Sequence, residues 1–218
     1  MFLPHPISES PTLTYQPGKI VCVGRNYAAH ARELGNPMPE RPLLFLKPPS
    51  AVIGDGDAIV LPEASQQVEH EGEIGVVLGT RLRHADEADA RAAIRGLACV
   101  NDVTARDLQK TDGQWTRAKG FDTFCPVGAV VPIGPDVDLR ALDVVCRVNG
   151  QVRQHGHTAD MAFPMTVLLS YISRIMTLEP GDLVVTGTPE GVGPLRAGDV
   201  VEVEIPGMAL LRNPVVEG

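Results

Sequence analysis

Two glutamates, Glu71 and Glu73, stand two residues apart at the start of an apolar run that extends to residue 78. Apolar residues recur there at every second position, which predicts a buried strand with both glutamates on one face. Their Cα atoms would lie roughly 6.6 Å apart, so both carboxylates could bind one cation, while Gly72 leaves the opposite side open. Carboxylate oxygens are the ligands that Mg²⁺, Mn²⁺ and Ca²⁺ prefer.

A second Glu-x-Glu pair shows what else this pattern can mean. Glu202 and Glu204 alternate with Val201, Val203 and Ile205. In a half-buried strand such an apolar set forms the core and the glutamates face water. A solvent-facing pair therefore stays open as an alternative for Glu71 and Glu73, and the metal interpretation depends on residues elsewhere.

Asp102 is the first of these residues. It follows an apolar run, residues 97–101, and stands before residues 104–110, which are predicted to form a helix. On that helix Asp102, Arg106 and Gln109 would share one face, and an ion-paired, solvated face is one interpretation. A lone carboxylate beside a buried strand is costly, however, and a cation shared with Glu71 and Glu73 would remove that cost. Three carboxylates leave octahedral positions free for a chelating substrate and a water.

Groups that could act on a substrate occur in three other segments. His30 and Glu33 are three apart on a short predicted helix, so Glu33 could orient His30 as a general base, although a surface pair fits the same spacing. Lys119 lies in a predicted loop and could stabilise a metal-bound enolate. Residues 186–191 follow a buried strand, and their hydroxyl and N–H groups could hold a carboxylate or form a plain turn.

The elements that must position these residues are mostly short strands. We predict them at 19–23, 43–47, 59–61, 74–78, 97–101, 127–131, 144–148, 183–186, 200–205 and 209–215, with short helices at 26–35, 86–94 and 104–110. Asn26 is the expected N-cap of the first helix. Asn149-Gly150 predicts a hairpin. Pro164 begins the one longer amphipathic helix. The pattern predicts a β-rich α+β fold, with a proline-rich extension at 1–18 and one catalytic domain at 19–218.

Composition excludes several classes of protein. The 218 residues carry a net charge of −8 with no basic tract, so nucleic acid is not an expected partner. No apolar run is long enough to span a membrane, and the N-terminus lacks the pattern of a secretory signal. We expect a cytoplasmic protein whose four cysteines are reduced. His155 and His157 have the spacing of a metal pair but no third ligand in view.

Together these residues resemble the fumarylacetoacetate hydrolase superfamily, in its acylpyruvate hydrolase and oxaloacetate decarboxylase branch. The resemblance covers the chain from about residue 19 to its end. It rests on VGRNY at 23–27, His30-x-x-Glu33, FLKP at 45–48, EGE at 71–73, NDVTARDLQ at 101–109, KGFDTFCP at 119–126, DMxF at 160–163 and TGTP at 186–189.

The resemblance implies a role for each candidate residue. Glu71, Glu73 and Asp102 would bind Mg²⁺ or Mn²⁺, with Ca²⁺ as a non-native occupant. His30 and Glu33 would activate water on a lid, and Lys119 would stabilise the developing oxyanion or enolate. The substrate would be contacted by Arg25, Lys47, Arg106, Gln109, Gly187 and Thr188. The fold would be a mixed β-sandwich-like roll, commonly a homodimer.

The activity implied is metal-dependent cleavage of a C–C bond in acylpyruvates, such as fumarylpyruvate or acetylpyruvate, as in aromatic catabolism. Its products would be pyruvate and a carboxylic acid. Oxaloacetate decarboxylation or tautomerisation, and isomerisation of 2-hydroxyhepta-2,4-diene-1,7-dioate, are alternatives on the same metal–enolate site. A non-catalytic metal- or ligand-binding protein is a remote alternative. Gly120, where the family pattern leads us to expect serine, and the pair His155 and His157 are the departures that bear on the choice of substrate.

Overall fold

The structure is a computed structural model that describes residues 16–218. The proline-rich extension predicted at 1–18 falls almost wholly on residues 1–15, outside the described part. Within residues 16–218 no helix is long and apolar enough to cross a membrane.

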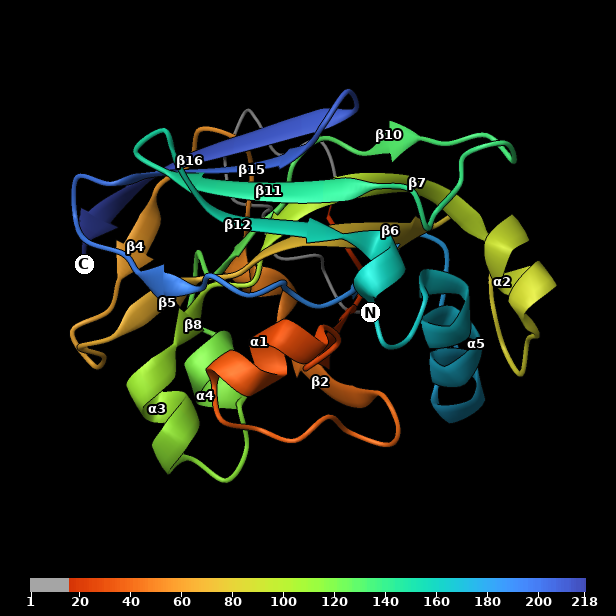
Figure 1. Cartoon of the computed structure of the whole chain (residues 1–218), viewed down its shortest axis with the longest axis horizontal. Helices are drawn as coiled ribbons and strands as arrows, with labels where there is room; N and C mark the ends of the chain where they lie inside the picture. The colour runs from red at the N-terminus through yellow and green to blue at the C-terminus, as the bar shows by residue number, and fades with distance from the viewer. Residues whose placement is uncertain (1–15) are drawn as a thin grey trace, which may run out of the picture.

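Two large β-sheets pack against each other and enclose the main core (Figure 1). The six-stranded sheet has the order β10-β7-β6-β13-β1-β2, and the five-stranded sheet has the order β12-β11-β15-β16-β4. The first contains β10 (Val131–Pro132), β7 (Ile94–Asn101), β6 (Gly72–Leu78), β13 (Leu183–Val185), β1 (Ile20–Gly24) and β2 (Leu43–Lys47). The second contains β12 (Gln151–His157), β11 (Asp143–Val148), β15 (Val200–Ile205), β16 (Ala209–Glu217) and β4 (Ile59–Leu61).

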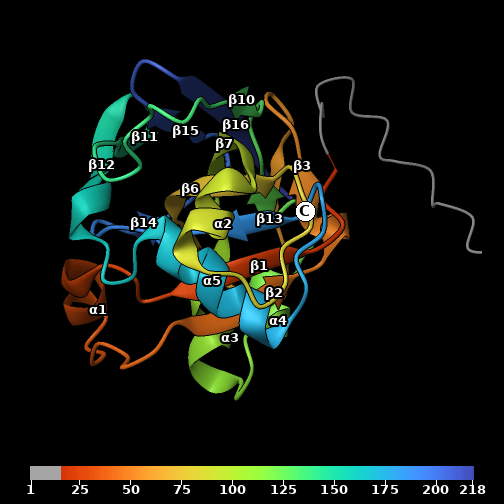
Figure 2. The ribbon, with the colours of Figure 1, turned by 90° about the vertical axis from the view of Figure 1, so that its right-hand side faces the viewer.

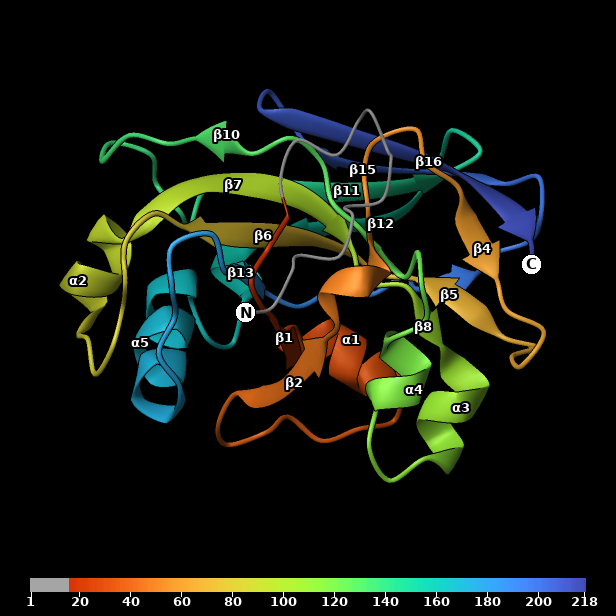
Figure 3. The same ribbon diagram turned by 180° about the vertical axis from the view of Figure 1, so that it is seen from behind.

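Smaller elements surround these sheets. A three-stranded sheet joins β14 (Gly193–Pro194), β5 (Val68–His70) and β8 (Thr104–Ala105), and β3 (Val52–Ile53) pairs with β9 (Cys125–Pro126). The helices are α1 (Ala28–Glu33), α2 (Glu87–Ala92), α3 (Arg106–Thr111), α4 (Thr116–Lys119) and α5 (Met165–Ile175), with single 3₁₀ turns at Pro49–Ala51 and Thr158–Asp160. Helix α2 packs against α5 (Figure 2), and α3 lies beside α4 near β8 (Figure 3).

The β-rich α+β prediction is confirmed, including the roll of two sheets and the single longer amphipathic helix α5. The predicted hairpin is present between β11 and β12, where Asn149 and Gly150 both have positive φ, 53° and 76°, as a type I′ turn requires. The Glu202 and Glu204 side chains lie on the outer face of β15 and pair with Arg212 and Arg147.

Four local predictions were wrong, and contacts between distant segments account for the strand and helix-cap differences. Residues 127–131 form an isolated bridge at Val127 and the two-residue β10, not one strand. Thr104 pairs with β5, so α3 begins at Arg106 and Asp102 lies before it in a loop.

Asn26 does not cap α1, because its side-chain amide bonds backbone groups of Phe163 and Thr186; Tyr27 occupies the cap position. Lys119 ends the short helix α4 rather than lying in a loop.

Candidate metal centre

The three acidic residues converge at the end of one antiparallel strand pair. Gly72 at the start of β6 is paired with Asn101 at the end of β7. Glu71 therefore lies beside Asp102, whose backbone N–H donates to the Glu71 carbonyl oxygen at 2.9 Å. One carboxylate oxygen from each of Glu71, Glu73 and Asp102 lies within 4.8 Å of the others, and all three residues are at most 4 % exposed. Within residues 16–218 this is the one such group of three potential ligands.

Three buried cations hold two of these acids. Lys119 Nζ donates to Glu71 Oε2 and Asp102 Oδ2, both at 2.7 Å, and so bridges them. Lys47 Nζ donates to Asp102 Oδ1 at 2.7 Å. Arg106 contacts Glu71 Oε1 at 2.5 Å and Glu69 Oε2 at 2.8 Å. Burial alone would raise the pKa of Glu71, but Lys119 and Arg106 outweigh it and hold that pKa below the usual range.

Glu73 is different, because no Lys, Arg or His of the described residues forms an ion pair with it; the backbone N–H of Gly187 donates to its carboxylate. Burial, and then the negative charges of Asp102 and Glu71, raise the pKa of Glu73 well above its usual value. The cluster contains four buried acids, Glu69 with the three above, and three buried cations. When all are ionised it carries one more negative charge than positive. Convergent carboxylate oxygens with a charge deficit fit a divalent cation such as Mg²⁺ or Mn²⁺.

Gly72 does not leave its opposite side open, contrary to our prediction. A Cβ atom placed on Gly72 would lie 2.8 Å from Cys146 Cβ, so glycine is needed for β11 to pack closely on β6. The Gln154 side chain closes the same side: its Oε1 accepts from the Gly72 N–H at 2.9 Å and from His70 Nδ1 at 3.0 Å. Its Nε2 donates to Thr188 Oγ1 at 2.7 Å. The hydrogen bond from the Gly72 N–H to Gln154 fixes the backbone between the two glutamates.

His30 and Glu33 do contact each other, on α1 at the edge of the cavity. His30 Nδ1 lies 3.3 Å from Glu33 Oε2, and His30 is buried. The Glu33 carboxylate also accepts the Gly191 backbone N–H, at 3.0 and 3.2 Å to its two oxygens. With Nδ1 turned toward Glu33, Nε2 is the ring nitrogen left to exchange a proton with a molecule in the cavity.

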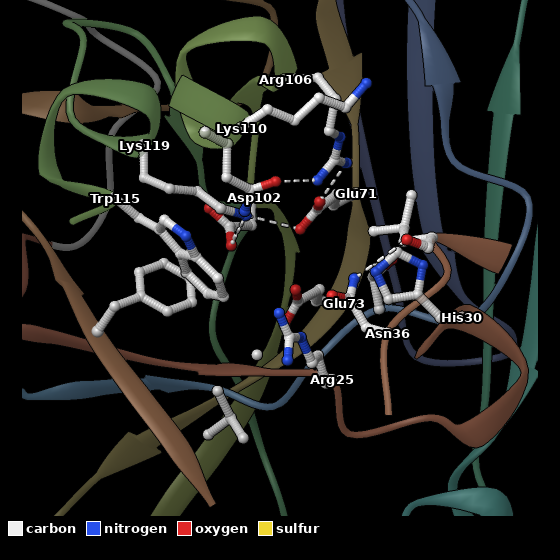
Figure 4. A pocket seen from close by; sticks show the side chains of 16 residues that line it. Arg25, His30, Asn36, Glu71, Glu73, Asp102, Arg106, Lys110, Trp115 and Lys119 are labelled. Atoms are coloured by element: carbon white, nitrogen blue, oxygen red, sulfur yellow. Dashed lines mark hydrogen bonds and ion pairs between the residues drawn. The ribbon is translucent and has the colours of Figure 1, made fainter. Parts of the chain in front are cut away.

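A cavity of about 220 Å³ adjoins the acids and the dyad (Figure 4). In this view the acids lie between Trp115 on one side and His30 on the other. Of the predicted site residues, the lining includes Arg25, His30, Glu71, Glu73, Asp102, Arg106, Gln109, Lys119 and Thr188. Gln109 Oε1 accepts from Arg106 at 2.6 Å, which leaves its NH₂ group available to a ligand.

Three predicted residues are placed apart from the open cavity. Lys47 is absent from its lining and donates instead to the Asp102 carboxylate and the Val103 carbonyl. The Gly187 N–H donates to the Glu73 carboxylate, and the Glu33 carboxylate contacts His30 Nδ1 and does not line the cavity. The Thr188 hydroxyl donates to the Gly72 carbonyl at 2.9 Å, although Thr188 also lines the cavity.

Sequence reasoning missed several lining residues, namely Leu34, Asn36, Phe45, Lys110 and Trp115, together with Gln154 behind the site. Trp115 could have been singled out as the one tryptophan of the chain. Gln154 carried no signal beyond its place on a hairpin strand. His155 contacts Asp143, and the His157 ring accepts the Ala159 N–H, so neither belongs to a group of three ligands in the described residues.

Comparison with known proteins gives one consistent result. Residues 19–216 match the family described as the C-terminal domain of fumarylacetoacetate hydrolase. A mitochondrial oxaloacetate tautomerase of Arabidopsis thaliana is 46 % identical over 201 residues, covering 90 % of each chain. A mitochondrial oxaloacetate decarboxylase of Dictyostelium discoideum is 44 % identical over 195 residues, covering 87 % of this chain and 89 % of the relative. The solved structure of a 5-carboxymethyl-2-hydroxymuconate delta-isomerase from Mycobacterium smegmatis superposes with a TM-score of 0.85 at 46 % identity, covering 94 % of this chain and 80 % of that one.

Proposed function

The chain belongs to the fumarylacetoacetate hydrolase family, and we propose that it is an enzyme that forms and protonates the enolate of a small 2-oxo acid, acting on oxaloacetate as a tautomerase or decarboxylase. The observation that carries this proposal is the buried group of three acids, two of them bridged by Lys119, at a cavity that is also lined by His30, the partner of Glu33.

In this proposal Glu71, Glu73 and Asp102 hold Mg²⁺ or Mn²⁺. Such an ion, when bound, supplies Lewis-acid polarisation of a 2-oxo carboxylate. The charge count supports a dianionic substrate. Four acids and three cations leave −1, which a divalent ion converts to +1, and Arg25 and Lys110 add two positive charges to the cavity wall. A dicarboxylate is therefore attracted, whereas the acids alone would repel it.

Lys119 is proposed to stabilise negative charge on the C2 oxygen. Burial would disfavour its ammonium form, but Asp102 and Glu71 outweigh that effect and raise the pKa of Lys119 above its usual value. Lys119 therefore stays protonated at neutral pH and acts as a hydrogen-bond donor, not as a base. A fixed donor in a water-poor site is worth far more against developing charge than the same group in water.

His30 is proposed to move the proton. In tautomerisation, it removes a proton from the enol hydroxyl or from C3 and returns one to the other position, so the substrate gains and loses one proton overall. In decarboxylation, the electron pair of the C3–C4 bond moves into the C2–C3 bond as CO₂ leaves, and the π pair of the C2 carbonyl moves onto its oxygen. His30 then delivers a proton to C3 as the carbonyl forms again. Glu33 orients the ring through its contact with Nδ1.

Hydrolysis of an acylpyruvate is the second candidate, and the contact of Glu33 with both His30 and the Gly191 N–H favours it. Here His30 takes a proton from water, and the hydroxide attacks the distal carbonyl carbon. The C–C bond breaks, a carboxylic acid forms, and pyruvate leaves as its enolate beside Lys119. The names of the relatives favour the oxaloacetate reactions, so we place hydrolysis second.

The decisive experiment follows oxaloacetate with protein stripped of metal and then reloaded with Mg²⁺ or Mn²⁺. Enol–keto conversion is read from ultraviolet absorbance, pyruvate from a coupled assay, and acetylpyruvate loss in parallel. We expect metal-dependent turnover of oxaloacetate that Glu73→Gln abolishes and Glu204→Gln, in the outer Glu-x-Glu pair, leaves intact. Oxaloacetate turnover equal with and without metal would contradict the proposal. Turnover of acetylpyruvate alone would favour the second candidate. Homodimer formation and cytoplasmic location stay predictions.

A further inference from the structure

The metal-centre cavity shares one wall with a larger, mostly apolar groove. This groove, of about 870 Å³, runs along the edge strand β2, where it is lined by residues 43–49 and by residues 113–116. Arg25, Phe45 and Trp115 line both spaces. The aromatic pair is therefore a partition, with the small polar cavity on one side and the apolar groove on the other.

The position of Trp115 is set by contacts on two sides. Its ring packs edge-on against Phe45, with ring centroids 5.3 Å apart and planes at 72°, a favourable aromatic geometry. On another side a Cβ atom at Gly24 would lie 2.9 Å from Trp115 Cζ3, so the indole occupies space beside β1 that only glycine leaves free. Lys119 Nζ lies 5.0 Å from the Phe45 ring centroid, so this wall begins directly beside the proposed reaction centre.

We infer that Trp115 determines substrate length: it keeps the cavity to short 2-oxo acids and separates it from the groove, which would otherwise take an apolar acyl or aryl tail. This inference rests on the proposed function, because it assumes that a 2-oxo carboxylate is anchored at the acids. Arg25 and Lys110 favour a carboxylate at the far end of a short substrate, whereas the groove offers aliphatic and aromatic side chains.

The kinetic test compares Trp115→Ala and Trp115→Leu with Trp115→Phe, which keeps an aromatic wall. For each folded variant, checked by circular dichroism, kcat/KM for enol–keto conversion is measured with a short 2,4-dioxo acid ending in methyl and one ending in phenyl. We expect the phenyl-to-methyl ratio to rise by about tenfold or more in the Ala and Leu variants, as differences of several carbon atoms in a pocket allow. It should change less than about threefold in Trp115→Phe. An unchanged ratio in folded Ala and Leu variants overturns the inference.

A binding test separates failure of this inference from failure of the proposed function. Oxamate and N-phenyloxamate are chelating, non-reacting analogues that differ in the phenyl tail, and their Kd values with Mg²⁺-loaded protein are measured by calorimetry. Trp115→Ala should tighten N-phenyloxamate relative to oxamate by about tenfold. This result supports the inference even if oxaloacetate is not turned over. Absence of oxaloacetate turnover would contradict only the proposed function. The inference is overturned if the ratio of the two Kd values is the same in wild type and variant, or if neither analogue binds.

Intrinsic fluorescence adds a readout in the unmodified protein. Trp115 is the one tryptophan of the 218 residues, so the indole emission reports on this wall alone. Oxamate added to Mg²⁺-loaded protein should change that emission in proportion to calorimetric occupancy. Calorimetric binding without any change in emission would place the ligand away from Trp115 and contradict the assignment.

Discussion

Replacing Glu73 by glutamine should stabilise the metal-free protein while removing most of the stabilisation that Mg²⁺ provides. The wild-type carboxylate is 2 % exposed, lies near Asp102 and Glu71, and accepts one backbone N–H from Gly187. Glutamine is nearly isosteric, and its carbonyl oxygen can accept the same N–H while the buried charge disappears. The amide is also a far weaker ligand for a hard cation.

The magnitude with metal follows from mass action. A ligand present at a hundred times its Kd stabilises the folded state by about 2.7 kcal/mol. For a chain of this size each kcal/mol shifts Tm by about 2–4 °C, so Mg²⁺ should raise the wild-type Tm by roughly 5–10 °C. In Glu73→Gln that shift should fall to about 1–2 °C at the same Mg²⁺ concentration. The order of the two Tm values should therefore reverse between EDTA and Mg²⁺.

The pH dependence in EDTA has a defined sign. Burial, with Asp102 and Glu71 next, raises the folded-state pKa of Glu73 above its unfolded value. The stability that the protonated form contributes is then fully present below the unfolded pKa and is lost as pH rises through the folded pKa. The Tm advantage of Glu73→Gln over wild type should widen over that range.

Scanning calorimetry at several pH values, in EDTA and in Mg²⁺, measures all of these quantities. Glu204→Gln is the control, because Glu204 also belongs to a Glu-x-Glu pair but lies on the outer face with Arg147. Its Tm should stay within about 1–2 °C of wild type in both conditions. A Glu73→Gln protein that is less stable in EDTA and keeps the full Mg²⁺ shift would refute the assignment of Glu73 as a ligand.

Three other changes test separate parts of the structure. Gly72→Ala should lower the free energy of unfolding by about 1–3 kcal/mol in a denaturant titration, because the new Cβ would lie 2.8 Å from Cys146 Cβ. Lys47→Met should cost about 3–5 kcal/mol in EDTA by the same titration, since it leaves Asp102 Oδ1 without its buried partner; a raised KM with unchanged stability would instead make Lys47 a substrate contact. Tyr27→Phe should leave the free energy of unfolding unchanged or raise it, because the buried Tyr27 hydroxyl has no hydrogen-bond partner in the described residues; a loss above about 1 kcal/mol would contradict this.

The grouping of the candidate residues was predictable because it depends on short-range spacing. Glu-x-Glu, His-x-x-Glu and an acid after an apolar strand can each be recognised within a few residues, and the structure brings these groups to one cavity. The hairpin at Asn149-Gly150 was predictable for the same reason, since its turn geometry is set by two residues.

What could not be predicted depends on contacts between residues far apart in the chain. Gln154 bonds Gly72 across 82 positions, and Lys47 reaches Asp102 across 55. Lys47 could be recognised as part of a motif, but the motif does not show that its ammonium group is used on a carboxylate inside the protein. The wall of Phe45 and Trp115 joins an edge strand to a loop between two helices, and no local pattern marks such a pair.

The two Glu-x-Glu pairs explain why neighbouring strands, and not the motif, decide whether glutamates can bind a metal. In β15 the glutamates face outward and alternate with buried valines. Strand β6 lies between β7 and β13 in the sheet, and all of its residues are buried. At Gly72, Cys146 of β11 packs against one face. Neither Glu71 nor Glu73 can therefore be hydrated as a surface carboxylate is. Lys119 contacts Glu71 and the Gly187 N–H donates to Glu73, and a bound cation would neutralise the remaining charge. A shift of one residue in the pairing of β6 with β7 would turn Glu73 into the core and leave Asp102 beside Gly72. The close contact of Gly72 with Cys146 and the Gln154 hydrogen bond oppose that shift, so residues of the second sheet hold the three acids in register.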